Sequence, residues 1–413
     1  MKKILALVLS LCMVFALCAA SASAADEVKV GLITLHDENS GYDKNFIDAF
    51  KAACEATGVT PVIKSNVPED QSAYDEAANL ADSGCAAVFT DSYGHQQYVL
   101  DAAREFPEVQ FTSCTGDMAL TEEVENYHNA FANIYQGRYL AGVAAGLKLN
   151  EMIESGDITA EQAKMGYVGA MPYAEVISGY TSFYLGAKSV CPSVTMDVIY
   201  TGSWYNETLE KETAEALING GAVLISQHAD SMGAPNACEA AGVPNVSYNG
   251  STQTACPNSY IISSRIDWTP YFTYAIEKVL AGENYDTDWT AGIETGSVAL
   301  TEINENVAAA GTAEKLAEVE AAILDGSLNV FDCSAFTVTV SENESDANYG
   351  NNNSSVAAVD ADGHLTSYIA DVVNDGTFVP ETEAVENGVF NESVYRSAPY
   401  FYAIIDGINV LSK

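Results

Sequence analysis

The sequence predicts an α/β protein of two lobes, each a doubly wound parallel sheet, joined by a hinge and followed by a C-terminal extension. Three observations lead to this prediction. Apolar, strand-like runs alternate with helical patterns over residues 28–115, and the alternation begins again after residue 160. Near-continuous apolar strands that alternate with helices are typical of parallel sheets with helices on both faces. A chain of 413 residues is also longer than one ordinary domain.

The first 24 residues have the pattern of an export signal. Two lysines precede an apolar run over 4–18, and small residues end the segment at Ala24. A lipoprotein would have a small residue before its acylated cysteine, but Cys12 and Cys18 each follow a leucine. We therefore expect cleavage after Ala24 without a lipid anchor, and an extracytoplasmic protein at the cell surface or in the periplasm. No later segment approaches the length of a membrane span.

The first lobe opens on a strand, a polar turn and a helix. Residues 28–33 are apolar and β-branched, whereas Phe46, Phe50 and Ala53 repeat at helical spacing. Such junctions lie at the carboxyl ends of strands in open α/β sheets, where ligands bind. The following elements of this lobe are expected as strands at 61–65, 85–91 and 109–114 and helices at 70–83 and 95–106.

A helix rich in alanine and glycine over 135–147 begins the second lobe, and its small residues predict close helix packing. The elements expected after it are strands at 164–170, 195–200, 222–228 and 243–248, with helices at 176–189 and 206–219 and a helix ending at 241. A return strand at 261–265 and a helix over 269–280 complete the body. We expect lobe 1 to comprise 25–135 and 264–330, and lobe 2 to comprise 136–263.

Residues 331–413 form the C-terminal extension, which we expect to fold onto the body because it is patterned and aromatic. No function follows from its sequence. Asp360-Ala-Asp362-Gly363 lacks the ligand series of a calcium loop, so it predicts a hairpin turn.

Composition excludes several classes of function. The net charge is -40, from 17 Lys+Arg against 57 Asp+Glu, so phosphate backbones and anionic membranes would be repelled. We expect no nucleic-acid partner. The cysteines show no C-x-x-C pair, so no zinc or other metal site is expected, and no cofactor is implied. Cys238 and Cys256 remain a conceivable disulfide.

An ordered series of motifs carries a family resemblance. The series comprises Asp43-Lys-Asn-Phe46, Tyr139-Leu-Ala-Gly-Val-Ala-Ala-Gly-Leu147, Gly166-Tyr-Val-Gly-Ala170, Gly202-Ser-Trp204 and Asp230-Ser-Met-Gly233. Over about residues 28–330 the chain resembles the basic membrane protein family, the substrate-binding proteins of ABC importers, whose best understood members are purine nucleoside receptors. The resemblance implies the type I periplasmic-binding-protein fold, with three crossovers between lobes that close on a ligand. It also implies a nucleoside ligand and, as partners, the permease and ATPase of the importer.

The resemblance assigns two ligand contacts in the opening turn. Asp37 stands where relatives bond the ligand, and Phe46 where they stack on its base; Asn45 is a third candidate from the same turn. Aromatic faces hold a heteroaromatic ring, and a carboxylate accepts hydrogen bonds from ring N–H or hydroxyl groups. A core position like that of Phe50 is an equal alternative for Phe46, and a turn-stabilising role is the alternative for Asp37.

Three positions depart from the family pattern. Thr115 and Asn249 stand where relatives have aspartates, and Arg265 stands where they have a lysine. Asn249 can still bond a hydroxyl group, and Arg265 would equally suit a carboxylate. Specificity for nucleosides is therefore left open, and both residues are candidate ligand contacts.

Further candidates follow predicted strands. Ser92, Tyr93 and His95 come after the third strand of lobe 1, and Trp204 follows a strand of lobe 2, where it would form the other wall of an aromatic sandwich. Asp230 opens a helix, so an N-cap role is its alternative.

No nucleophile elbow, phosphate loop or His-Glu-x-x-His helix accompanies the five histidines, so we predict a binding protein without catalytic residues. Two alternatives remain: a nucleoside-processing hydrolase, and a ligand sensor for a sugar or a carboxylated small molecule. A monomer is expected.

Overall fold

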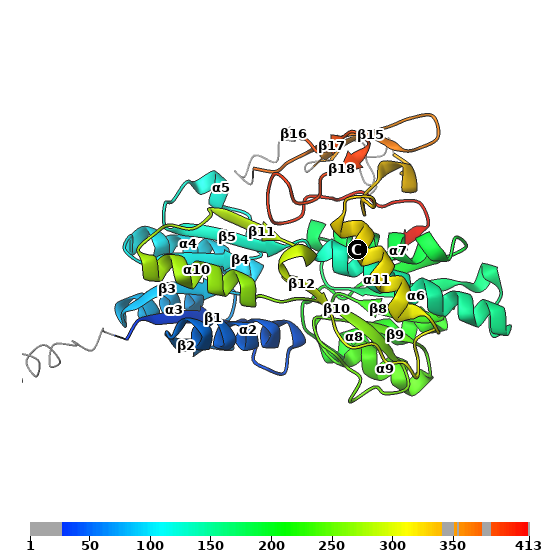
Figure 1. Ribbon diagram of the computed structural model, residues 1–413, viewed down its shortest axis with the longest axis horizontal. Coiled ribbons are helices and arrows are strands. Elements are labelled where there is room, and N and C mark those ends of the chain that lie inside the picture. Colours follow the sequence, from blue (N-terminus) through cyan, green and yellow to red (C-terminus); the bar gives the residue numbers. More distant parts are fainter. Residues whose placement is uncertain (1–26, 341–350, 353–354, 374–380, 412–413) are drawn as a thin grey trace, which may run out of the picture.

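The computed structural model describes residues 27–340, 351–352, 355–373 and 381–411, so the export signal predicted over 1–24 lies outside the described residues. Two α/β lobes lie side by side, and the C-terminal extension lies across one side of both (Figure 1). This confirms the predicted two-lobed fold class. In the described part of the chain, no helix combines the length and the apolar character that crossing a membrane requires.

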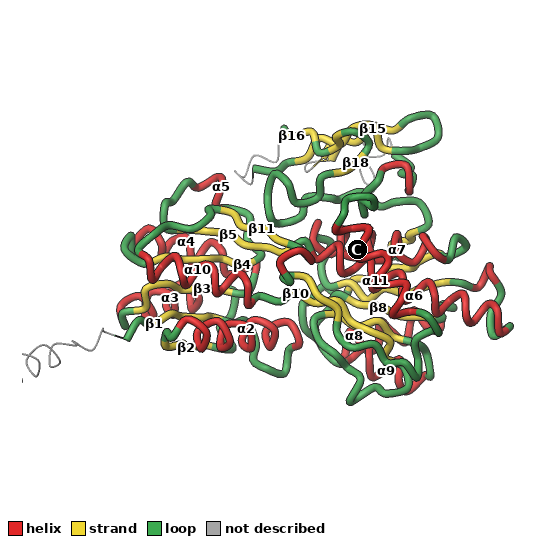
Figure 2. Tube along the Cα trace, viewed as in Figure 1, coloured by secondary structure: helices red, strands yellow, loops and turns green. Residues whose placement is uncertain are grey.

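Lobe 1 has a sheet of six parallel strands with helices on both faces (Figure 2). In sheet order the strands are β11 (Asp288–Ala291), β5 (Tyr127–Ala132), β4 (Gln110–Cys114), β3 (Cys85–Thr90), β1 (Lys29–Ile33) and β2 (Thr60–Lys64). The helices are α2 (Gly41–Thr57), α3 (Gln71–Asp82), α4 (Gln96–Glu105), α5 (Ala119–Glu122), α10 (Thr269–Ala281) and the 3-10 turn η1 (Tyr93–His95). Helices α2 and α10 bury one face of the sheet, and α3 and α4 bury the other.

Lobe 2 has seven strands, all parallel except the antiparallel edge strand β12. In sheet order they are β12 (Val298–Leu300), β10 (Tyr260–Ile266), β9 (Asn245–Tyr248), β8 (Leu224–Gln227), β6 (Lys164–Gly169), β7 (Thr195–Tyr200) and β19 (Ile408–Val410). The helices are α6 (Ile134–Ser155), α7 (Ala174–Val190), α8 (Glu207–Asn219), α9 (Gly233–Ala241) and α11 (Thr312–Leu324), with the 3-10 turn η2 (Ala160–Gln162). Two further 3-10 turns lie outside the lobe: η3 (Ile293–Thr295) in a crossover and η4 (Cys333–Ala335) in the C-terminal extension. Helices α6 and α7 cover one face, and α8 and α9 cover the other.

Glycines bring the backbones of α6 and α7 into contact. A Cβ on Gly142 would lie 2.0 Å from the carbonyl oxygen of Phe183, and one on Gly186 would lie 2.0 Å from that of Tyr139. The close packing predicted from the small residues of α6 is confirmed.

Three segments cross between the lobes. They are Asn133 between β5 and α6, Asp267 between β10 and α10, and residues 292–297 between β11 and β12. Helix α10 and strand β11 belong to lobe 1. The prediction that 298–330 also belongs to lobe 1 is wrong, because β12 pairs with β10 and α11 packs on α6.

The described residues of the C-terminal extension form two small antiparallel sheets. They comprise β13 (Asn351–Asn352), β14 (Ser355–Val359), β15 (Leu365–Ala370) and β16 (Thr382–Glu383), and separately β17 (Val385–Glu386) and β18 (Val389–Phe390). Asp360 lies in the turn between β14 and β15, where its carboxylate accepts from the N–H groups of Asp362 and His364. The predicted hairpin turn is thus confirmed. The aromatic residues Tyr368, Phe390 and Phe401 join the core of lobe 2.

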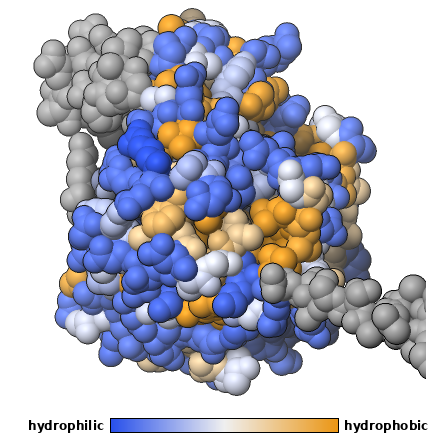
Figure 3. Space-filling model, turned by 90° about the vertical axis from the view of Figure 1, so that its left-hand side faces the viewer, coloured by the Kyte–Doolittle hydropathy of each residue, from blue (hydrophilic) through white to orange (hydrophobic). Residues whose placement is uncertain are grey.

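The surface at the lobe 1 end is mostly polar (Figure 3). Viewed from the lobe 1 end, the molecule is largely hydrophilic with small hydrophobic patches (Figure 3). The seven described cysteines are buried and free, including Cys238 and Cys256.

Candidate binding cleft

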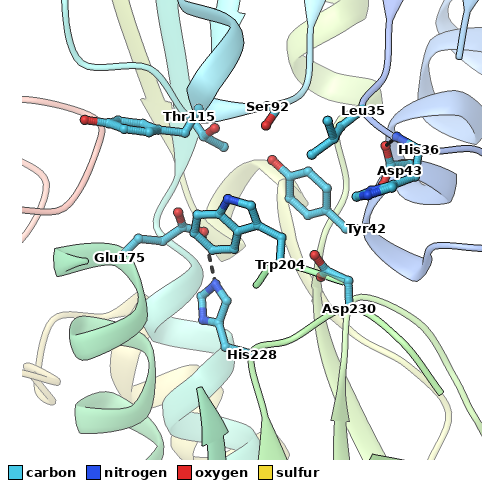
Figure 4. A pocket seen from close by; sticks show the side chains of 11 residues that line it. Leu35, His36, Tyr42, Asp43, Ser92, Thr115, Glu175, Trp204, His228 and Asp230 are labelled. Carbon is cyan, nitrogen blue, oxygen red and sulfur yellow. Dashed lines mark hydrogen bonds and ion pairs between the residues drawn. The ribbon is translucent and has the colours of Figure 1, made fainter. Parts of the chain in front are cut away.

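A cavity lies between the two lobes, at the carboxyl ends of their strands (Figure 4). Its lining residues are Leu35, His36, Tyr42, Asp43, Ser92, Tyr93 and Thr115 from lobe 1 and Glu175, Trp204, His228 and Asp230 from lobe 2. They follow β1, β3 and β4 in lobe 1 and β6, β7 and β8 in lobe 2. About 390 Å³ of space lies between these atoms, part of it open to solvent. Binding at strand ends is the general rule for open α/β sheets.

The start of α2 presents an aromatic ring and a carboxylate to the cavity. Ser40 caps the helix by accepting from the N–H of Asp43. The buried Asp43 carboxylate accepts from the backbone N–H of His36 at 2.6 Å and lies 3.3 Å from Nδ1 of the same residue. The Tyr42 hydroxyl donates to the backbone oxygen of Asp91 at 2.5 Å. These bonds fix the turn and hence the position of the Tyr42 ring.

Aromatic side chains reach the cavity from both lobes. Figure 4 shows Tyr42 entering from lobe 1 and Trp204 from lobe 2. Tyr173, at the start of α7, lies 5.9 Å from Trp204 and 5.9 Å from Tyr93, measured between ring centroids. The rings therefore form a nearly continuous rim from one lobe to the other, suited to a flat ligand.

The charged side chains that line the cavity are acidic. Asp43, Glu175 and Asp230 line it, whereas no lysine or arginine is among the lining residues. Burial raises the pKa of Asp230 well above its ordinary range, and repulsion from Asp43 adds to this effect. Burial likewise raises the pKa of Asp91, which lies behind Tyr42. Among the described residues, no cluster of three or more His, Cys, Asp or Glu side chains could hold a metal ion.

A buried arginine orders the lobe 2 side of the cavity. Arg138 of α6 donates to the backbone oxygen of Gln227 at 2.9 Å and lies 3.2 Å from Nδ1 of His228. Arginine only donates, so Nδ1 accepts and the other ring nitrogen carries the proton. That nitrogen, Nε2, lies 3.2 Å from the Glu175 carboxylate. Burial lowers the pKa of His228, which favours this neutral form. The arrangement fixes Glu175 with an oxygen toward the cleft.

Four of the predicted site residues line the cavity: Ser92, Tyr93, Trp204 and Asp230. Asn45 and Asn249 lie beside it and join the lobes, because the Asn45 amide donates to the backbone oxygen of Asn249 at 2.9 Å. Asn249 adopts the left-handed conformation, φ 64°, which asparagine tolerates.

Four other predicted residues lie elsewhere. Phe46 is fully buried in the lobe 1 core, stacked on Trp268 with centroids 4.3 Å apart. Asp37 stabilises its own turn by accepting from the N–H of Asn39. His95 is buried with Nε2 at 2.9 Å from the backbone oxygen of Val67.

Arg265, the fourth of these residues, pairs with Asp267 at 3.0 Å and does not line the cavity. For Phe46 and Asp37 the structural alternatives describe the observed positions. Arg265 is thus paired with a neighbouring acid instead of binding a carboxylate of the ligand.

Sequence reasoning missed Tyr42, Asp43, Glu175 and Arg138. A signal for Tyr42 existed, since it precedes Phe46 by four residues and lies nearer the strand end, on the first turn of the helix. Arg138 also carried one, as a charged residue inside the small and apolar stretch 137–147 of α6. Glu175 carried no signal beyond its place in the first turn of a helix.

The chain is similar to known substrate-binding proteins of ABC transporters. A family model described as an ABC transporter substrate-binding protein, PnrA-like, matches residues 33–328. A purine-binding protein of Brucella abortus is 30% identical over 318 residues, which cover 75% of this chain and 85% of that protein. A putative ABC transporter glucose-binding protein of Haloferax volcanii is 32% identical over 260 residues, covering 63% and 61%. A nucleoside-binding protein of an ABC transporter from Lactococcus lactis is 24% identical over 215 residues, covering 50% and 56%.

Solved structures with low sequence identity show the same fold. A solute-binding protein of an ABC transporter from Aeropyrum pernix superposes with a TM-score of 0.62 at 18% identity, covering 73% of this chain and 92% of that one. One from Conexibacter woesei gives a TM-score of 0.60 at 22% identity, covering 73% and 98%.

Proposed function

The chain belongs to the PnrA-like family of ABC transporter substrate-binding proteins, and from this membership we propose that it captures a purine nucleoside between its lobes. It then delivers the nucleoside to the permease of an importer, outside the cytoplasmic membrane. The Brucella purine-binding and Lactococcus nucleoside-binding relatives support the choice of ligand class.

One observation carries the proposal. Tyr42 and Trp204 enter a single cavity from opposite lobes, and acidic side chains surround them. Two aromatic rings can enclose a heteroaromatic base when the lobes close. The carboxylates of Asp43, Glu175 and Asp230 can accept hydrogen bonds from ribose hydroxyls or base N–H groups. Closure of lobes around a ligand is a hinge motion of the kind that three crossovers permit.

The charge of the cavity disfavours an anionic ligand. Bringing a phosphate or carboxylate beside Asp43 and Glu175, with no lysine or arginine among the lining residues, would add repulsion in a partly desolvated site. Arg265, which would have suited such a group, is paired with Asp267. A nucleoside is therefore favoured over its 5′-phosphate and over carboxylated small molecules.

A sugar is the second candidate, because a relative 32% identical to this chain is a putative glucose-binding protein. Hydroxyl groups of a sugar would meet the same carboxylates, and its apolar face would meet Trp204.

A thermal-shift screen of residues 25–413, followed by calorimetry, tests the proposal. The compounds are guanosine, adenosine, inosine, uridine, guanosine 5′-monophosphate and glucose. A ligand at 100 times its Kd stabilises the folded state by about 2.7 kcal/mol. We expect a purine nucleoside to raise the melting temperature and the monophosphate to have no effect. Chromatography of the released ligand should show no hydrolysis.

Binding of glucose with no response to nucleosides would overturn the ligand class while leaving the family unaffected. Conversion of the nucleoside to base and sugar would overturn the transport role. Tyr42→Ala is the matched control, since it removes a cavity ring and leaves the fully buried Phe46 in place.

A further inference from the structure

The C-terminal extension is anchored in lobe 2. Its last strand, β19, adds to the lobe 2 sheet beside β7, where the N–H of Met196 donates to the backbone oxygen of Gly407 at 2.9 Å. The amide of Asn409 donates to the Asp197 carboxylate at 3.0 Å. Tyr368, Phe390 and Phe401 of the extension share one core with α6 and α7. The extension must therefore move with lobe 2.

The same extension also contacts lobe 1, through hydrogen bonds to Asp288. The N–H of Ser397 donates to one carboxylate oxygen of Asp288 at 2.7 Å, and its hydroxyl donates to the other at 2.5 Å. Asp288 is the first residue of the edge strand β11, and Ser397 is only 2% exposed. Both carboxylate oxygens of Asp288 thus accept hydrogen bonds from Ser397, a residue of the extension that is anchored in lobe 2.

A second contact joins the extension to the ligand cavity. Arg396 is buried and donates to the backbone oxygens of Val372, Ala398 and Pro399, so its guanidinium is held within the extension. It lies 3.8 Å from Oδ2 of Asp117 in lobe 1.

The same Asp117 oxygen accepts from the hydroxyl of Tyr93 at 3.3 Å, and Tyr93 lines the cavity. Arg396 of the extension and Tyr93 of the cavity therefore meet at the same carboxylate, that of Asp117.

We propose that the C-terminal extension is a brace between the lobes, which holds lobe 1 through Ser397 and Asp288 and positions Tyr93 in the cavity through Arg396 and Asp117. Figure 1 shows the extension above β11 of lobe 1 and α7 of lobe 2. The family match ends at residue 328, so the brace lies outside the part of the chain that defines the family. The holding role is independent of the ligand, whereas the positioning role rests on the proposed function.

The brace favours the arrangement of the lobes in this structure before a ligand arrives. A movement of lobe 2 away from β11 would separate Ser397 from Asp288 and leave a partly buried carboxylate without these two donors. A protein that already populates the binding-competent arrangement loses less affinity to conformational change. The brace should thus narrow the range of lobe separations in the ligand-free protein.

Distance measurement between spin labels tests the holding role without any ligand. Labels on Glu55→Cys in α2 and Glu212→Cys in α8 report the separation of exposed sites on the two lobes. We expect Asp288→Ala to give longer and broader distances than the unchanged chain. Tyr395→Phe is the matched control, because it removes a hydrogen bond to Glu386 on the surface of the extension, away from lobe 1.

Unchanged distances in Asp288→Ala, with the fold verified by circular dichroism, would overturn the holding role. Ser397→Ala gives a second reading of the same contact, since it removes the hydroxyl and keeps the N–H donor. It should give an intermediate distribution.

A double-mutant cycle with guanosine as the probe tests the positioning role. Asp117→Asn should weaken guanosine binding by roughly threefold to tenfold, the worth of one hydrogen bond. In a Tyr93→Phe background the same substitution should have no further effect, because Asp117 acts through the Tyr93 hydroxyl.

Additive losses would overturn the positioning role, since a general structural effect does not depend on that hydroxyl. If guanosine fails to bind the unchanged protein, the proposed ligand is wrong, and the label distances still decide the holding role.

Discussion

Tyr42 and Phe46 lie one turn apart on α2 with ring centroids 5.1 Å apart, yet Tyr42 lines the cavity and Phe46 is fully buried in the core. Tyr42 thus belongs to the binding site, and Phe46 belongs to the core that supports it. Phe46 stacks on Trp268, so the core directly supports the turn that holds the cavity ring. Truncating one ring or the other should therefore separate binding from folding.

Tyr42→Ala should weaken guanosine binding by roughly tenfold to a hundredfold, because stacking of a base on an aromatic ring is worth about 1–3 kcal/mol. Its stability should change little by comparison. Phe46→Ala should instead lower the free energy of unfolding by about 3–5 kcal/mol through loss of a core ring. Calorimetry and urea unfolding measure the two effects. The assignment fails if Phe46→Ala remains stable and loses affinity while Tyr42→Ala binds normally.

Trp204 and Trp268 allow a second comparison of a binding-site ring with a core ring. Trp204 lines the cavity, whereas Trp268 is 1% exposed in the lobe 1 core. We expect Trp204→Ala to lose about tenfold or more in guanosine affinity by the same stacking argument. Trp268→Ala should lose several kcal/mol of stability, about 3–5 by analogy with other core rings. Intrinsic fluorescence on ligand addition gives a further check, since quenching should vanish in Trp204→Ala.

Much of the fold could be predicted because the strands of parallel sheets read as apolar runs. The strands near residues 30, 88 and 167 each precede a helix, and this alternation determines the architecture. The boundary after residue 297 could not be predicted. Strand β12 has three residues, and only its antiparallel pairing with β10 places it in lobe 2.

The binding site was harder to predict because strand ends identify loops but not the direction of each side chain. Ser92, Tyr93, Trp204 and Asp230 follow strands and do reach the cavity. Phe46 shows the limit: two aromatic residues four positions apart on one helix both fit an apolar face. The contact between Ser397 and Asp288 joins positions 109 apart in the chain and has no local signature.

Gly142 tests the contact between α6 and α7 in lobe 2. A methyl group there would lie 2.0 Å from the carbonyl oxygen of Phe183, which belongs to a helix backbone and has little freedom to move. We expect Gly142→Ala to destabilise the protein by about 1–3 kcal/mol, the usual cost of overpacking. Urea unfolding measures the change. Gly41→Ala is the control, since no atom lies within 4 Å of its added methyl group.

Equal stability of Gly142→Ala and Gly41→Ala would contradict the prediction, because it would mean that α6 and α7 can move apart at little cost. The higher helix propensity of alanine, about 1 kcal/mol over glycine, works against the expected loss and makes the comparison a stringent one.

Glu392 makes the stability of the protein depend on pH. Its side chain is buried between Ser178 and Ser393, whose hydroxyls donate to it, and burial raises its pKa from an ordinary 4.5 to about 7. Between pH 4.5 and 7 the folded protein keeps a proton that the unfolded chain releases. The free energy of unfolding should therefore fall as the pH rises through this window, by roughly 3 kcal/mol in total, and level off above it.

Glu392→Gln removes the titrating group and keeps a side chain of similar shape. The free energy of unfolding of this variant, relative to that of the unchanged protein, should therefore rise from pH 5 to pH 7 and then stay constant. Glu386→Gln is the control, because Glu386 is exposed in the same extension. Urea unfolding at pH 5, 6, 7 and 8 gives the difference in free energy of unfolding between each variant and the unchanged chain. The contributions of the other buried acids are the same in both proteins and cancel in this difference. A difference that is the same at every pH would show that Glu392 keeps its charge when buried, which requires stronger donors to its carboxylate than the two serines provide.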